Sequence, residues 1–210
     1  NGNETHVLSI PLVIDKTTGR KFGKTEGGAI WLDANKTTPT AFYQFWINTD
    51  DNSAIEFLKI YTELNKDEIE EISTKQQADS SQRIAQKTLA FEVTKLVHGE
   101  QSAHIAEKVT SYLTGNNHIG DANVEELNAL IKEIPTVNIS EDNSLIDVLV
   151  KAGLASSNSE ARRLIEANAI SINSKKVSKD NFDDEDFVNG RAIIRRGKAF
   201  KDSALVLRNN

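Results

Sequence analysis

Cysteine and methionine are both absent from this chain of 210 residues. Without cysteine there is no disulfide and no thiolate metal site, so packing must stabilise the fold, which suits a reducing compartment. Because natural proteins begin with methionine, we expect Asn1 to be a processed end or, preferably, a cut through a longer protein. No apolar run approaches the roughly 20 residues of a membrane helix, and the first residues do not resemble a signal peptide. We therefore expect a cytoplasmic protein without a membrane partner.

Composition is that of a soluble globular protein, with 38% hydrophobic and 27% charged residues. The length allows one or two domains. The net charge of −6 argues weakly against a nucleic-acid partner. However, residues 143–210 carry 12 basic and 9 acidic side chains, so this tail is at +3 and the remainder at −9. Such asymmetry indicates a tail that contacts nucleic acid.

The apolar spacing predicts a helical middle followed by a small mixed segment. Thr38-Pro39, Asp50 or Asp51, and Ser80 or Ser81 are expected to begin helices, because these residues favour caps and first turns. Pro135 and the polar stretch 138–143 indicate a linker. The other predicted elements are a strand over 8–14, helices near 41–46, 55–64, 67–72, 84–97, 102–113, 123–131, 144–150 and 158–167, and strands over 169–172, 191–196 and 204–207.

Two of these short helices have apolar stripes that are expected to face each other. One stripe is Leu145, Val148 and Leu149, and the other is Ala161, Leu164 and Ile165. If they pack together, Arg162, Arg163 and Glu166 point outward. The pattern thus predicts arginines on a surface.

A basic loop, Lys21-Phe22-Gly23-Lys24-Thr25, follows the first predicted strand. Two ammonium groups three positions apart, with a glycine between them and a hydroxyl beside the second, suit an anion whose charge grows during a reaction. A P-loop is an alternative, but its spacing is one residue short and Glu26-Gly27-Gly28 is a poor helix start. A solvated basic turn is the other alternative.

The flanks of this loop carry a family resemblance. The sequence continues as Glu26-Gly27-Gly28-Ala29-Ile30-Trp31-Leu32-Asp33, then Phe42-Tyr43-Gln44-Phe45-Trp46-Ile47-Asn48, and later Leu96-Val97-His98-Gly99. Together with the loop, these stretches resemble the tyrosine-tRNA ligases of bacterial type. In this class I family the second signature, of the form Lys-Met-Ser-Lys-Ser, commonly becomes Lys-Phe-Gly-Lys-Thr. The resemblance spans essentially the whole chain.

The resemblance implies specific roles for the loop. Lys21 and Lys24 would be the catalytic residues, stabilising the pyrophosphate leaving group as tyrosine attacks the α-phosphate of ATP. Gly23 would let the loop approach phosphate, and Thr25 would add a hydroxyl contact, so Lys21, Gly23, Lys24 and Thr25 form the expected ATP site. Magnesium is expected with ATP in the full enzyme.

The nucleotide-binding fold that should precede this loop is missing, together with its His-Ile-Gly-His signature. Asn117-His118-Ile119-Gly120-Asp121 is superficially similar, but it follows the lysine loop, so we interpret it as a turn between helices. The tyrosine pocket and the homodimer interface of the family also belong to the missing N-terminal half. We therefore expect this chain to be inactive alone.

The tail, residues 143–210, resembles the small RNA-binding module of ribosomal protein S-four. The resemblance lies in Ser159–Ile165, in Ala169–Asn173 with the lysines after it, and in Ile194–Lys198. It implies that basic groups of this module contact the phosphates of tRNA(Tyr). The expected tRNA-binding residues are Arg162, Arg163, Lys175, Lys176, Arg195, Arg196 and Lys198.

No metal site is expected. His6, His98 and His104 have no ligand partners at metal spacing beside them. Asp183-Asp184-Glu185-Asp186 lacks the glycine and alternating spacing of a cation loop, so a solvated turn is favoured.

The predicted fold class is multidomain, mainly α and then α+β. Residues 1–35 would be the end of a class I nucleotide-binding fold, 36–139 a helical anticodon-binding domain and 143–210 the S-four-like module. The predicted function is that of the C-terminal portion of a tyrosine-tRNA ligase, with tyrosine, ATP and tRNA(Tyr) as partners of the full-length enzyme. The alternative is a stand-alone, non-catalytic RNA-binding adaptor derived from such an enzyme.

Overall fold

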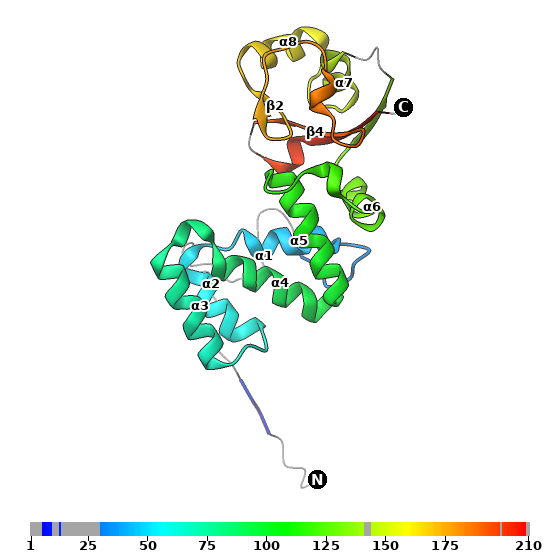
Figure 1. The fold of residues 1–210 in the computed structure, drawn as a ribbon. Helices are drawn as coiled ribbons and strands as arrows, with labels where there is room; N and C mark the ends of the chain where they lie inside the picture. The colour runs from blue at the N-terminus through cyan, green and yellow to red at the C-terminus, as the bar shows by residue number, and fades with distance from the viewer. Residues whose placement is uncertain (1–5, 10–12, 14–29, 141–143, 198, 209–210) are drawn as a thin grey trace.

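The computed structural model describes residues 6–9, 13, 30–140, 144–197 and 199–208. The helical part, over 39–133, comes first along the chain. The sheet part, over 136–208, follows it and consists of a small mixed sheet with two further helices (Figure 1). This arrangement confirms the predicted order of a mainly α region and an α+β region. The lysine loop and most of the strand predicted over 8–14 lie outside the described residues.

The described residues form helices and a few short 3₁₀ turns besides the strands. None of the described helices is long and apolar enough to span a membrane. The helices are α1 (Pro39–Ile47), α2 (Asp51–Tyr61), α3 (Lys66–Ala78), α4 (Ile84–His98), α5 (Glu100–Thr114), α6 (Val124–Glu133), α7 (Leu145–Lys151) and α8 (Asn158–Glu166), and the 3₁₀ turns are η1 (Ser80–Gln82), η2 (Ile119–Asp121), η3 (Asp184–Asp186) and η4 (Phe200–Asp202).

Most helices begin where capping chemistry predicts. The Thr38 hydroxyl accepts from the amide of Ala41 with proline at the first position of α1, and the Asp50 carboxylate accepts from two amides of α2. The cap predicted at Ser80 or Ser81 is wrong. Those residues form η1, and α4 begins only after Arg83, whose left-handed backbone (φ 52°) redirects the chain.

The sheet contains β1 (Thr136–Ile139), β2 (Ile170–Ile172), β3 (Lys175–Lys176), β4 (Arg191–Arg196) and β5 (Ser203–Arg208), in the spatial order β1-β5-β4-β2-β3. β1 runs parallel to β5, and the other pairs are antiparallel. The linker predicted at Pro135 and over 138–143 is therefore partly wrong. Residues 136–139 pair with the last strand of the chain and belong to the sheet.

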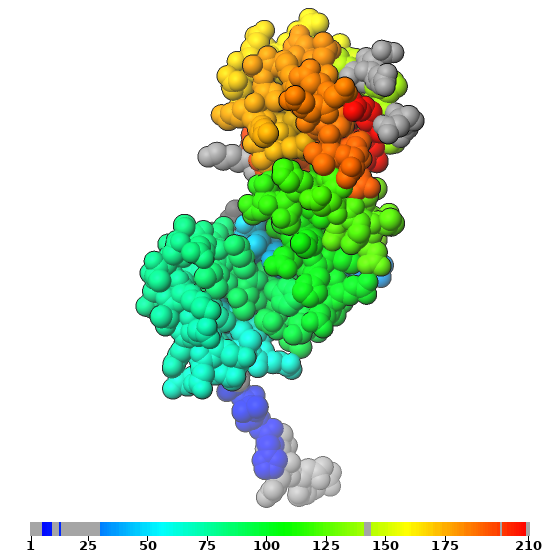
Figure 2. All heavy atoms as spheres, in the orientation of Figure 1, coloured from blue at the N-terminus to red at the C-terminus, as the bar shows by residue number. Residues whose placement is uncertain are grey.

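Three apolar clusters hold the molecule together. One lies among α1–α5 and contains Phe42, Trp46, Leu58 and Leu89. A second lies between one face of the sheet and α7 and α8. The third joins the opposite face of the sheet to α5, η2 and α6. Figure 2 shows the α5–α6 segment, in green, filling the space between the first helices and the sheet.

Candidate nucleic-acid interface

Helix α8 presents two arginines to solvent. Ser157 caps the helix by accepting from the amide of Glu160, and Ala161 and Ile165 are buried against the sheet and α7. The facing stripes predicted for α7 and α8 are thereby confirmed, because five of their six side chains belong to this cluster and the sixth, Leu164, packs against it. Arg162 and Arg163 lie on the opposite side of the helix and are exposed. Both guanidinium groups are accessible to a phosphate.

The β2–β3 hairpin presents a second pair of cations. Asn173 and Ser174 have positive φ (45° and 67°), the geometry of a tight primed turn. The Asn173 amide holds the turn to β4 and to the following loop, donating to the Asp186 carbonyl at 2.7 Å and accepting from the Ile193 amide at 2.9 Å. Lys175 and Lys176 then form the edge strand β3, and both are exposed. The turn therefore fixes where these ammonium groups lie.

Arg195 and Arg196 are only partly exposed, since each guanidinium donates to a main-chain carbonyl. Arg195 Nη1 donates to Leu113 O at 2.8 Å, and Arg196 Nη1 donates to Leu154 O at 2.9 Å. Arg196 also lies 3.9 Å from a carboxylate oxygen of Glu160. The structure thus divides the predicted tRNA-binding set into four exposed cations and two anchored arginines. Lys198 is outside the described residues.

The acidic run at η3 has cations of its own chain beside it. Lys179 forms ion pairs with Asp183 and Asp186, the second at 2.8 Å. Arg208 Nη1 lies 2.7 Å from Asp184, and its guanidinium stacks on the ring of Phe187. Within the described ranges no group of three His, Asp or Glu side chains is placed to hold a metal ion. These carboxylates therefore act as internal counter-ions, and a bound cation is not needed to explain them.

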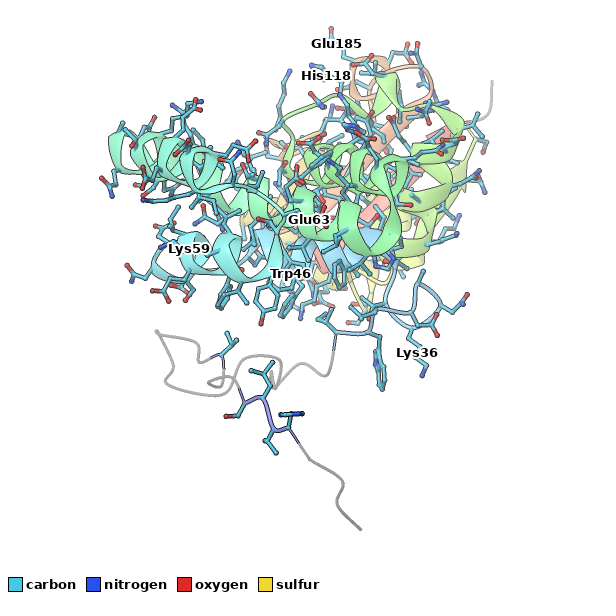
Figure 3. All side chains as sticks on the ribbon, turned by 90° about the horizontal axis from the view of Figure 1, so that it is seen from below. Lys36, Trp46, Lys59, Glu63, His118 and Glu185 are labelled. Carbon is cyan, nitrogen blue, oxygen red and sulfur yellow. The ribbon has the colours of Figure 1, made fainter. Side chains whose placement is uncertain are left out.

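The face formed by α2 and α3 is acidic. Residues 50–71 contain eight Asp and Glu against Lys59 and Lys66, and Figure 3 labels Lys59 and Glu63 on this side. A polyanion is repelled by such a surface. This end of the molecule is therefore an unfavourable surface for a polyanion.

An apolar cavity of about 460 Å³ opens in the helical part. Phe42, Trp46 and Tyr61 line it together with Leu96, and Trp46 and Glu63 at its wall are labelled in Figure 3. Its walls offer hardly any donors for a phosphate or a ribose. The cavity therefore does not resemble a nucleotide site.

His98 belongs to the packing of the helical part. Its ring meets Phe42 edge-on, with 4.9 Å between centroids, and burial lowers the pKa of the imidazole below its ordinary value of 6.5. His104 is exposed on α5 and lies against Phe91. His118 directly precedes η2, so the interpretation of residues 117–121 as a turn between helices is confirmed.

A comparison with protein families identifies the family to which this chain belongs. Residues 1–114, more than half of the chain, match the family model of class I tRNA synthetases (W and Y). The chain belongs to this family. Residues 126–201 of this synthetase chain match a second model, the tyrosine–tRNA ligase SYY-like C-terminal domain. The resemblance to tyrosine-tRNA ligases is thereby confirmed, and it covers both parts of the molecule.

Individual relatives point in the same direction. The synthetase chain is 48% identical over 137 residues to tyrosine–tRNA ligase 2 of Bacillus cereus, which covers 64% of this chain and 32% of that protein. It is also 48% identical over 130 residues to tyrosine–tRNA ligase of Streptococcus pyogenes, covering 62% and 31%. A C-terminally truncated mitochondrial tyrosyl-tRNA synthetase of Aspergillus nidulans aligns at 37% identity over 43% of this chain and 25% of that chain, with a TM-score of 0.41 that by itself supports no conclusion about the fold. The synthetase chain thus spans about a third of the length of its curated relatives.

Sequence reasoning missed two residues, one in β4 and one in the turn before it, that bond to the segment around η2. Arg191 Nη1 donates to Ala122 O at 2.7 Å, and Asn189 Nδ2 donates to Gly120 O at 3.0 Å. In each pair the partners are 69 positions apart. No local pattern of the synthetase sequence marks such a pair, because the helix-to-sheet contact is created only by the fold.

Proposed function

We propose that this chain supplies the lysine loop and the tRNA-gripping part of a tyrosine-tRNA ligase, which joins tyrosine to tRNA(Tyr) using ATP. The observation that carries the proposal is the 48% identity to tyrosine–tRNA ligases over 137 residues. Residues 1–35 would end the catalytic domain, 36–139 would form the anticodon-binding domain, and 143–210 would form an S-four-like module. Tyrosine, MgATP and the partner subunit would bind mainly to other parts of the enzyme.

The lysine loop supplies electrostatic stabilisation in this proposal. Lys21 and Lys24 hold the pyrophosphate as tyrosine attacks the α-phosphate of ATP, with Lys24 as the principal group. Gly23 permits close approach of the backbone, and Thr25 adds a hydroxyl contact. In a full-length enzyme that carries this chain, Lys24→Met should slow formation of tyrosyl-adenylate about 100- to 1,000-fold. A rate within twofold of the parent would remove Lys24 from this role.

The isolated chain should not catalyse tyrosine-dependent exchange of pyrophosphate with ATP, because half of the ATP site is expected elsewhere. Exchange above background with the pure chain would overturn this part of the proposal.

Binding to tRNA rests on the exposed cations of the sheet part. We expect the chain to bind tRNA(Tyr) weakly and with steep salt dependence. Arg162→Glu combined with Arg163→Glu should weaken binding and lower the slope of log K against log salt by about one unit for each lost phosphate contact. The matched control is Lys66→Glu combined with Lys75→Glu on α3, since both lysines are exposed but surrounded by carboxylates. Equal effects of the two double variants would contradict the proposed interface.

A further inference from the structure

The sheet part and the helical part share one apolar core. Val109, Leu113 and Ile119 come from α5 and η2, and Leu130 comes from α6. Ile193 of β4 and Leu205 of β5 enter the same cluster from the sheet, and all of these side chains are at most 6% exposed. If the two parts were joined only by a flexible linker, each would expose its own apolar surface at the joint. In this structure the two apolar surfaces are instead buried against each other.

Three side chains of the sheet part donate hydrogen bonds across this contact. Arg195 reaches the Leu113 carbonyl at 2.8 Å, Arg191 the Ala122 carbonyl at 2.7 Å, and Asn189 the Gly120 carbonyl at 3.0 Å. Leu113 lies in the last turn of α5, where carbonyls have no partner within the helix and carry the negative end of the helix dipole. A guanidinium is well suited to such an acceptor, so the bond from Arg195 is charge-assisted.

At two glycines the helical part lies so close to the sheet part that there is no room for a side chain. A Cβ atom on Gly120 would lie 2.2 Å from Val188 Cγ1 and 2.9 Å from the Val188 carbonyl oxygen. A Cβ atom on Gly115 would lie 1.9 Å from Ser174 Oγ, at the tip of the β2–β3 hairpin. Contacts under 3.0 Å require the neighbouring atoms to move. The turn that resembles a catalytic signature in the sequence therefore seats the sheet against the helices.

We infer that Arg195 and Arg191 are positioning residues that lock the sheet part onto α5, η2 and α6, so that the two parts face RNA as one rigid body. The RNA half of this inference rests on the proposed function. Arg195 is thereby removed from the phosphate contacts and given a structural task. Its Nε atom is buried and has no acceptor within the described part of the chain, so the guanidinium is enclosed by the joint at the cost of one unsatisfied donor.

The absence of cysteine allows a direct test of rigidity. Spin labels at Gln77→Cys on α3 and Glu166→Cys on α8, both exposed, report the distance between the two parts. The otherwise unchanged chain should give one narrow distance distribution. Arg195→Gln combined with Gly120→Ala should broaden it at least about twofold, while far-ultraviolet circular dichroism stays unchanged because neither change lies in the core of one part. A broad distribution in the unchanged chain overturns the inference.

The second measurement separates a positioning role from a phosphate contact. Arg195→Gln should weaken tRNA(Tyr) binding about tenfold without changing the salt slope, because pre-organisation is lost while the number of phosphate contacts is kept. The matched control, Arg162→Gln, should lower the slope by about one unit. If Arg195→Gln lowers the slope equally and leaves the label distance narrow, Arg195 is a phosphate ligand and the inference is wrong. If the unchanged chain binds no tRNA, the proposed function fails, and the label distances alone decide the joint.

Discussion

The Tyr112 hydroxyl donates a 2.7 Å hydrogen bond to the carboxylate of Glu126 in the buried space between α5 and α6. The same carboxylate oxygen accepts from the Asn123 amide at 3.0 Å and completes the capping box of α6. Burial, followed by the bond to Glu126, raises the pKa of the Tyr112 phenol well above its ordinary value, so the phenol keeps its proton and remains a donor even at alkaline pH.

Removing this donor should destabilise the contact between α5 and α6. Tyr112→Phe leaves a buried carboxylate with one partner fewer, and we expect the free energy of unfolding to fall by about 1–3 kcal/mol. Urea denaturation measures the change. A double-mutant cycle with Glu126→Gln should give a coupling energy of at least about 0.5 kcal/mol. Additive effects would show that the two groups do not interact.

Replacing both lysines of β3 should affect RNA and leave the fold alone. If each of the two ammonium groups contacts one phosphate, as the proposed interface requires, Lys175→Gln combined with Lys176→Gln should lower the salt slope of tRNA binding by about two units. The thermal unfolding free energy should change by less than about 0.5 kcal/mol, since both side chains are exposed. Lys66→Gln with Lys75→Gln is the control. A change in stability without a change in slope would be the contrary result.

His98 should make the helical part sensitive to acid. Because the pKa of His98 is lowered in the folded state, the unfolded chain binds more protons near pH 6.5, and stability falls as pH falls through this range. His98→Gln should flatten the dependence of unfolding free energy on pH between about 7 and 5. His104→Gln, at an exposed position, is the matched control. Parallel curves for all three proteins would show that the His98 site is irrelevant to acid stability.

The parts of the fold that local chemistry controls were predictable. The helices predicted near 123–131 and 144–150 are present, and Asn123 and Ser144 cap α6 and α7, because a cap depends on residues three positions apart. β1 could not be predicted. It has only four residues, its hydrogen-bonding partner β5 lies almost 70 positions away, and a proline with polar neighbours conceals it.

The candidate site was predictable in the same uneven way. Exposure of Arg162 and Arg163 follows from helical periodicity, since the buried positions Ala161 and Ile165 fix which face points outward. The bond between Arg195 and the Leu113 carbonyl joins residues 82 positions apart. A basic stretch at 195–196 suits phosphate as well as it suits a helix end, so only the fold distinguishes the two.

The shortness of β3 has a consequence for association between molecules. β3 is the outer strand beside β2, and it offers two residues of backbone flanked by two exposed ammonium groups. A second chain that tried to add a strand there would gain few hydrogen bonds and would meet two like charges if it were another copy. The lysines proposed to attract RNA therefore also discourage sheet-to-sheet aggregation.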